Sequence, residues 1–251
     1  MRLLRDSYLL MLRSLREARR HPGIEIGNIF LPLFFFAVTV GSLESIAGSA
    51  FGVTDFVGFQ IPVALLQAVA VGTAGSGLVS DIQKGYFDKL ALTPAPRPSL
   101  ILGRMAADGV RGLVLGTIVV IAGLIAGGHI EAGVPGAVLL VVIGGVFSLA
   151  YSGLAVALAL RTGSNQAVQL SFLFFFPLIF LSPAFAPKEV FSGWLEFLAT
   201  INPFTYILEG TRALVLEGWD GPALLKALAA IAGMASVTTS LTVWAYRYRK
   251  V

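Results

Sequence analysis

Few side chains in this sequence belong to the types that catalyse reactions or bind metal ions. It contains two histidines, His21 and His129, and no cysteine. Neither an H-E-x-x-H motif for zinc nor a G-x-x-x-x-G-K-[ST] loop for nucleotide phosphates occurs in it. We therefore expect a chain that is not an enzyme, with no catalytic residue and no metal ion or cofactor of its own. Any energy it uses must then come from a partner.

Two carboxylates border otherwise apolar stretches. Glu25 and Asp108 are expected near helix ends, and Asp108 stands four residues after Arg104 and three before Arg111. Those spacings bring side chains together on one face of a helix. An ion pair on the helix surface is the simpler interpretation. A proton relay is the alternative, because ionisable groups within a membrane often mark ion paths.

Four uncharged side chains are candidates for a substrate path. Gln60 and Gln67 lie seven residues apart and share a helix face, where their amides can bond a substrate or a facing helix. Phe35 and Phe175 belong to two phenylalanine-rich runs. Such runs line an apolar path or simply pack against lipid and core, and the spacing of the phenylalanines is compatible with both roles.

Membrane helices must position these residues. The 251 residues are 56% hydrophobic and 13% charged, with a mean hydropathy of +0.83, whereas soluble domains have about 25% charged residues. A spanning helix needs about 20 apolar residues. We predict an all-α polytopic membrane protein, which excludes a soluble enzyme, a DNA-binding module and a disulfide scaffold. Its six predicted spans are 24–43, 56–79, 106–127, 136–160, 167–183 and 222–245.

The basic residues predict the orientation of these spans. An even number of spans puts both termini on one side, and of the 18 Lys and Arg only Lys188, Arg212 and Lys226 fall on the other side. The positive-inside rule then makes both termini cytoplasmic. The net charge of +4 is thus an orientation signal, and we expect no nucleic-acid partner. The Ala/Gly/Val-rich composition points to a bacterial inner (cytoplasmic) membrane.

Residues 1–22 are predicted to form a helix apart from the transmembrane domain at 23–251. One face of this helix carries apolar side chains and the other is rich in arginine, as in helices that lie on an anionic membrane surface. The apolar face holds Leu4, Tyr8, Met11, Leu12 and Leu15.

Two connections between spans are unusual. The one at 81–104 contains a short amphipathic stretch at 86–92, which predicts a surface helix around 82–92. The one at 184–221 has Val190, Trp194 and Leu198 at helical spacing, followed by apolar pieces of about 12 residues. These are too short to span a membrane, so we expect re-entrant or interfacial helices.

Both connections resemble the membrane subunits of ABC-2 type exporters. The matching positions of the first are Gly85, Leu90, Thr93, Pro94, Arg97, Leu102, Gly103 and Arg104. Those of the second are Ser182, Pro183, Pro187, Trp194, Leu195, Asn202, Pro203 and Arg212. With six spans and an N-terminal amphipathic helix, the resemblance extends over essentially the whole chain, and the string at 103–111 is similar to the drug-resistance branch.

The resemblance implies a permease in an ATP-driven exporter of amphipathic or hydrophobic molecules, drug-like or lipid-like. It would pair with a second permease copy or a paralogue and with two cytoplasmic ATP-binding subunits, which would bind the ATP and Mg²⁺. The residues coupling it to those ATPases would be Asp81, Lys84, Gly85, Tyr86, Phe87, Asp88, Leu90, Thr93 and Pro94. An external gate would contain Pro183, Trp194, Asn202 and Pro203.

Other functions remain open at this point. A permease for polysaccharides or lipid-linked glycans is the alternative within the same family. A polytopic membrane enzyme or scaffold acting on lipids is the alternative from a different class, and the missing acid/base cluster disfavours the enzyme.

Overall fold

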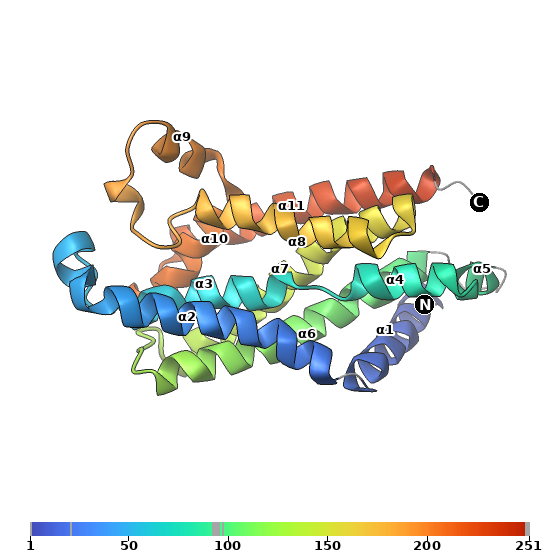
Figure 1. Ribbon diagram of the computed structural model, residues 1–251, viewed down its shortest axis with the longest axis horizontal. Helices are drawn as coiled ribbons and strands as arrows, with labels where there is room; N and C mark the ends of the chain where they lie inside the picture. Colours follow the sequence, from blue (N-terminus) through green and yellow to red (C-terminus); the bar gives the residue numbers. More distant parts are fainter. Residues whose placement is uncertain (1, 21, 92–95, 97, 249–251) are drawn as a thin grey trace.

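The computed structural model describes residues 2–20, 22–91, 96 and 98–248, and within these ranges it contains helices and no strand (Figure 1). The α-helices are α1 (Arg2–Arg20), α2 (Pro22–Phe51), α3 (Phe56–Ala70), α4 (Ala74–Gln83), α5 (Tyr86–Ala91), α6 (Pro98–Ile125), α7 (Gly133–Thr162), α8 (Asn165–Phe180), α9 (Trp194–Ile201), α10 (Pro203–Arg212) and α11 (Gly221–Arg247). A 3₁₀ turn, η1 (Lys188–Val190), and a π-helical turn, η2 (Ala213–Glu217), complete the described elements.

Five segments of the described residues are long and apolar enough to cross a membrane, which makes the chain a multi-pass membrane protein and confirms the all-α prediction. They are Glu25–Phe51, Phe56–Gln83, Pro98–Ile125, Gly133–Thr162 and Gly221–Arg247. The remaining predicted span, 167–183, corresponds to α8. This helix is apolar, but its 16 residues are fewer than the ~20 that span a hydrocarbon core.

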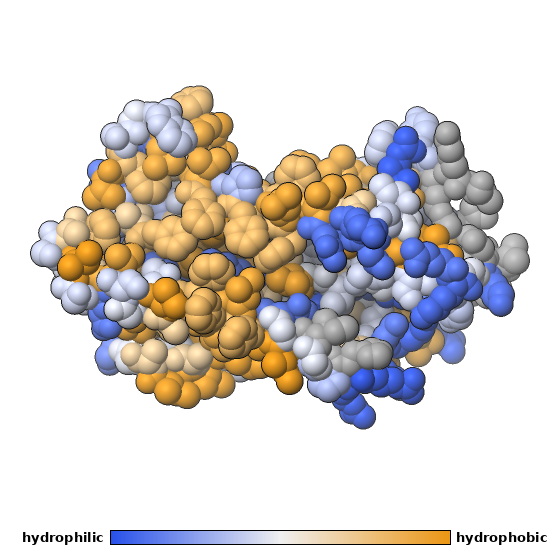
Figure 2. Space-filling model, viewed as in Figure 1, coloured by the Kyte–Doolittle hydropathy of each residue, from blue (hydrophilic) through white to orange (hydrophobic). Residues whose placement is uncertain are grey.

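The long helices run roughly along the long axis of the molecule, and the first and last described residues lie at the same end of it (Figure 1). Figure 2 shows hydrophilic side chains gathered at that end, apolar ones over the middle of this face, and some hydrophilic ones again at the opposite edge. We call the end that carries α1, α5 and the C-terminus of α11 the basic end. The opposite end, where α9 and α10 lie, is the α9 end.

The core is built around α3, whose side chains are almost all buried between α2, α6, α7 and α10. Four stacked or edge-on aromatic rings, Phe147 and Tyr151 of α7, Phe175 of α8 and Phe204 of α10, join three helices. Phe147, Phe175 and Phe204 are fully buried. This cluster fixes α8 and α10 against α7.

The second predicted span is interrupted. We expected a continuous helix at 56–79, but α3 ends at Ala70 and α4 begins at Ala74, with Val71, Gly72 and Thr73 between them. The interruption lies inside a candidate membrane span. Because free backbone N–H groups are costly within a membrane, the broken turn needs partners from elsewhere.

Two other segments differ from the prediction. The helix expected across 82–92 is divided: Ile82 belongs to α4, and Gly85, at φ +66°, turns the chain into α5. This backbone conformation suits glycine, which has no Cβ to clash. In the second connection Val190 lies in η1, apart from α9, so Val190, Trp194 and Leu198 do not share one helix.

Candidate functional site

A cavity of about 870 Å³ opens at the interruption between α3 and α4. We call it the main cavity. Its walls come from α1, α2, α4, α6 and α8, and they differ in character. Polar side chains line much of it, namely Ser14, Glu17, Glu25, Asn28, Thr73, Ser76, Ser80, Arg104, Asn165, Gln166, Gln169 and Ser171. Apolar side chains of α8 line another part, namely Leu170, Phe172, Leu173 and Phe176.

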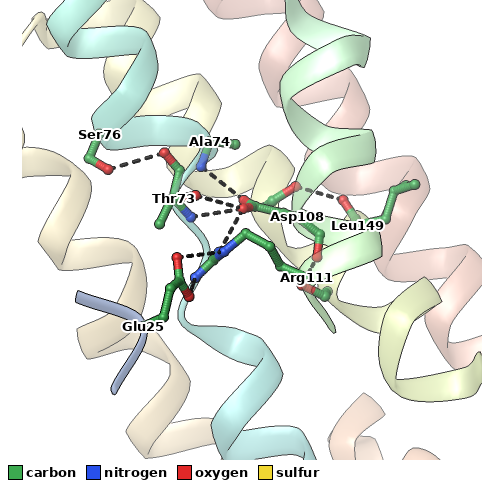
Figure 3. Close-up of polar contacts among 9 residues, drawn as sticks. Glu25, Thr73, Ala74, Ser76, Asp108, Arg111 and Leu149 are labelled. Atoms are coloured by element: carbon green, nitrogen blue, oxygen red, sulfur yellow. Dashed lines mark hydrogen bonds and ion pairs between the residues drawn. The ribbon is translucent and has the colours of Figure 1, made fainter. Parts of the chain in front are cut away.

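The interruption is held by Asp108 of α6 (Figure 3). Its Oδ1 accepts hydrogen bonds from the backbone N–H of Thr73 at 2.9 Å and from the Thr73 hydroxyl at 3.1 Å. Its Oδ2 accepts from the backbone N–H of Ala74 at 2.9 Å. Asp108 is buried, and it supplies the acceptors that the first N–H groups of a helix lack. A carboxylate at the N-terminus of α4 also complements the helix dipole.

Arg111 links this carboxylate to α2. Its Nη1 donates to Asp108 Oδ1 at 3.0 Å, while Nε and Nη2 donate to the two carboxylate oxygens of Glu25 at 3.0 and 2.5 Å. The contact with Glu25 is the bidentate geometry that the guanidinium group favours. The expected Asp108–Arg111 pair is therefore confirmed, but it is buried between three helices instead of lying on a helix surface.

A second ionic cluster holds the other end of α4. Asp81 accepts from Arg104 of α6 and, at 3.0 Å, from Nη2 of Arg13 of α1. Arg104 thus pairs with Asp81, not with Asp108. The Arg13 guanidinium also lies 4.1 Å from the centre of the Tyr86 ring. Burial lowers the pKa of Arg13, but the hydrogen bond and the charge of Asp81, together with Tyr86 and Glu17, outweigh this and raise the pKa overall. Asp81 therefore joins α1, α4 and α6.

The predicted coupling residues lie around this second cluster. Lys84 and Lys89 are exposed, Tyr86 is partly buried under Arg13, and Gly85 forms the turn before α5. We expected Phe87 to be offered to a partner, but only 4% of it is exposed, and it packs with Leu78 and Leu100. Phe87 therefore anchors α5 to the protein. Asp88 and Leu90 belong to α5, whereas Thr93 and Pro94 lie outside the described residues.

Three of the four predicted path residues come together. Phe35 of α2, Gln67 of α3 and Phe175 of α8 line a smaller pocket of about 120 Å³. This pocket shares Asn28, Val71, Phe172 and Phe176 with the main cavity. Gln60 is elsewhere: it is buried, and its Nε2 donates to the carbonyl oxygen of Ala184 at 3.3 Å. The shared face of Gln60 and Gln67 therefore does not give a shared site.

Asn28 has hydrogen-bonding capacity to spare where the two cavities meet. Its Nδ2 is buried and has no partner among the described residues. Its backbone carbonyl oxygen also lacks the usual helical bond, because residue 32 is proline and has no N–H to donate. Asn28 thus carries an unused donor at the cavity lining and a carbonyl oxygen without its usual helical donor.

The residues predicted for an external gate lie at the α9 end. Asn202 caps α10: its Oδ1 accepts from the Phe204 N–H at 3.0 Å, its Nδ2 donates to the Leu178 carbonyl of α8 at 2.6 Å, and Pro203 occupies the first helical turn. Proline suits that place because its missing N–H would have no helical partner there. Pro183 is buried, whereas Trp194 of α9 is 69% exposed.

Arg212 fastens the segment after α8 to α3. Its guanidinium donates to the carbonyl oxygens of Phe59, Pro183 and Ala184, and lies 3.4 Å from the centre of the Phe59 ring. Burial lowers the pKa of Arg212 to about 9, so it still carries its charge at neutral pH. Ala184 accepts from both Gln60 and Arg212, and this shared acceptor ties three segments together.

Sequence reasoning missed several of these functional residues. Thr73 and Asn28 were not singled out, and Arg13 was expected to contact anionic lipid, not Asp81. Glu25 and Arg111 were not paired, because they stand 86 residues apart. The run of small residues at 72–77 inside an apolar stretch was the available signal for the interruption.

Comparison with known proteins agrees with this architecture. Residues 6–216 match the family model described as ABC-2 type transporter. The chain is 27% identical over 244 residues to the daunorubicin resistance ABC transporter permease protein DrrB1 of Streptomyces coeruleorubidus, an alignment that covers 94% of this chain and 83% of the relative. It is 24% identical over 198 residues to the "Probable doxorubicin resistance ABC transporter permease protein DrrC" of Mycobacterium tuberculosis, covering 77% and 70%. Because the family model covers most of a chain that is itself a multi-pass helical membrane protein, the chain belongs to the ABC-2 type transporter family.

Proposed function

We propose that the chain is the transmembrane subunit of an ATP-driven exporter, and that its main cavity receives an amphipathic or hydrophobic substrate, drug-like or lipid-like. The observation that carries the proposal is the mixed lining of the cavity, which places charged groups, hydroxyls and amides beside the phenylalanines of α8. An amphipathic molecule needs both surfaces, since apolar walls supply contact area and a few polar groups set the orientation. The names of the drug-resistance relatives support the same substrate class.

Asn28 is the group that we expect to hydrogen-bond the substrate. Its Nδ2 is the unused donor described above, and its carbonyl oxygen lacks the usual helical donor. Phe35, Gln67 and Phe175 in the adjoining pocket would then contact the apolar part of the same molecule.

Coupling to ATP hydrolysis would pass through α5 and α4. Two ATP-binding subunits, which would hold ATP and Mg²⁺, would bind at the basic end around Lys84 and Lys89 and beside α1. Asp81 connects this region to α4, whose N-terminus forms part of the cavity wall. Movement of α5 would thus reach the cavity through one helix. Residues 1–22 would act as the interface helix of a transmembrane domain at 23–251.

A second copy or a paralogue would pack across the cavity-bearing face of α2 and α8. Support comes from α2, which leaves Phe30 and Phe34 stacked on each other and exposed. The basic end would face the cytoplasm of a bacterial cell, as the positive-inside rule requires. The capping residues at the α9 end, among them Asn202 and Arg212, would close the exit side until the ATPases act.

The test uses the chain purified with the ATP-binding subunit encoded beside its gene, reconstituted in liposomes with a panel of amphipathic drugs and lipids. We expect one class of compound to stimulate ATP hydrolysis. Ser76→Phe, which places a large side chain in the cavity, should abolish this stimulation and leave basal hydrolysis and co-purification intact. Ser236→Phe is the matched control. Ser76 and Ser236 are both exposed serines on helices, and each hydroxyl donates to a backbone carbonyl three or four residues earlier in the chain. Failure of an ATPase to co-purify, or equal stimulation of both variants, would contradict the proposal.

A further inference from the structure

A second large hollow lies on the other side of α8. It is a groove of about 630 Å³ between α7, α8, α10 and α11, and we call it the α11 groove. Its walls are almost entirely apolar, formed by residues such as Leu154, Leu178, Phe204, Met234 and Leu241. On α8, Phe176 lines the main cavity and Leu178 lines this groove. Two residues correspond to about 200° around a helix, so the two hollows face opposite ways.

The groove opens towards the bilayer. Most of α11 is not buried in the protein, and Leu225, Leu228 and Val237 on it are exposed apolar side chains. A surface of this kind inside a membrane is covered by lipid chains. An apolar hollow in it therefore draws its occupant from the surrounding hydrocarbon, not from water.

The length of the groove fits a lipid chain. On α11 its lining extends from Lys226 to Leu241, which is about 22 Å of helix at 1.5 Å per residue. The hydrocarbon core of a bilayer is about 30 Å thick. The groove is thus longer than the hydrocarbon depth of one leaflet, which is about half of this thickness.

The chemistry of one end fits a lipid headgroup. At the α9 end the lining changes from apolar side chains to Lys226 and Tyr206. Lys226 is exposed, so its ammonium group can reach the depth of lipid phosphates, as lysines near helix ends do. Glu209 interacts electrostatically with Lys226 and also with Lys188, Glu189 and Arg212, so this group of charges contains two acidic and three basic side chains.

Helix α9 continues the same surface. Its Trp194, Phe197 and Ile201 are exposed on one face, and Ile201 also lines the groove. Exposed Trp and Phe on one face of a short helix are typical of helices that lie at the boundary of headgroups and acyl chains. The groove mouth therefore lies where a phospholipid changes from polar to apolar.

We propose that the α11 groove binds one phospholipid, with an acyl chain between α8 and α11 and the phosphate at the Lys226 ammonium. This site is separate from the substrate cavity, and the inference requires only that the chain spans a membrane.

The experiment counts phosphatidylglycerol molecules retained by the purified chain, by native mass spectrometry after detergent washing. Gly233 lines the groove, and a Cβ added there meets no atom within 4 Å, so Gly233→Phe can begin its side chain freely and place a ring in the groove. Val237→Phe fills it from a second position. Ala232→Phe is the control, since Ala232 is exposed on the same helix but does not line the groove.

We expect one firmly retained lipid in the unmodified chain and in Ala232→Phe, and its loss in both groove-filling variants at unchanged helix content. Lys226→Gln should weaken retention about fivefold, the worth of one lysine near a lipid phosphate. Retention of the lipid in Gly233→Phe and Val237→Phe would overturn the site, and unchanged retention in Lys226→Gln would overturn the headgroup position. Loss of a dimer in the groove-filling variants, with no loss of lipid, would assign the groove to a second copy of the chain.

Discussion

Asp108 of α6 caps α4: its Oδ2 accepts a hydrogen bond from the backbone N–H of Ala74 at 2.9 Å, across a helix interruption within a membrane span. The interruption is stable because a carboxylate from a neighbouring helix replaces the missing helical acceptors. The same carboxylate is an ion-pair partner of Arg111. The position of the α4 N-terminus, which forms part of the wall of the main cavity, therefore depends on one side chain.

Asp108→Asn should destabilise the protein by about 3 kcal/mol, because Arg111 loses a buried partner and one of the two capping oxygens becomes an NH₂ group. Reversible unfolding in detergent would measure this change. Glu44→Gln is the matched control, since Glu44 is an exposed carboxylate on α2. Equal stability of the two variants would show that Asp108 is not needed for the cap.

Gly103→Val should detach α1 from α6. A Cβ at Gly103 would lie 2.7 Å from Leu10 Cβ and 2.8 Å from the Ser7 carbonyl oxygen, and that backbone cannot yield without moving the helix. Limited proteolysis within 2–20 should become faster in this variant. Gly41→Val carries the same cost in helix propensity on α2 but meets no atom within 4 Å, so its cleavage rate should stay unchanged. The same slow cleavage in both variants would refute the packing argument.

Phe87→Ala and Lys89→Glu should distinguish the anchoring of α5 to the protein from the docking of the ATP-binding subunit on α5. Removing the buried Phe87 ring should loosen α5 and lower stability by about 3 kcal/mol. Lys89 is exposed, so its reversal should keep the stability and reduce co-purification of the ATP-binding subunit severalfold. Lys188→Glu, near the α9 end, is the charge-matched control. If Lys89→Glu and Lys188→Glu retain the partner equally well, docking does not involve α5.

Glu209→Gln should stabilise the protein at neutral pH. Burial raises the pKa of Glu209, and Glu189 adds to this, while Lys188, Lys226 and Arg212 oppose it. A carboxyl whose pKa is higher in the folded state binds more protons there, so stability falls as the pH rises from the unfolded pKa through the folded one. Glu209→Gln has no carboxyl group to ionise at this position, so its stability does not fall in this way as the pH rises. Its melting temperature should exceed that of the unmodified chain at pH 7 and match it at pH 4; a constant difference across this range would contradict the assignment.

Local features of the fold were accessible from the sequence. The apolar stretches located the long helices because length and composition alone decide whether a segment suits a membrane. Asn202-Pro203 marks a helix start because an amide accepts from the first N–H groups and proline needs no acceptor there. Likewise, Gly85 marks a helix end.

The site itself depended on contacts that leave no local pattern. Arg13 and Asp81 are 68 residues apart, and the groups that Asp108 caps include backbone N–H groups, which every residue but proline has. The burial of Phe87 was also unpredictable, because the six residues of α5 are too few to establish which face is inward. Distances across the fold, not residue types, decided these positions.

The two ends of α4 are fixed to the same helix, at Asp108 and at Arg104 of α6, only four residues apart on that partner. A helix attached at a single point could pivot about that point. Two attachment points prevent α4 from doing so. Thr73 shares the attachment to Asp108, so Val71 and Gly72 are the residues that connect this restrained unit to α3, which the core encloses. A force applied at α5 would therefore move α4 and α6 together. This part of the main cavity wall would shift as one rigid unit, without a change in the shape of either helix.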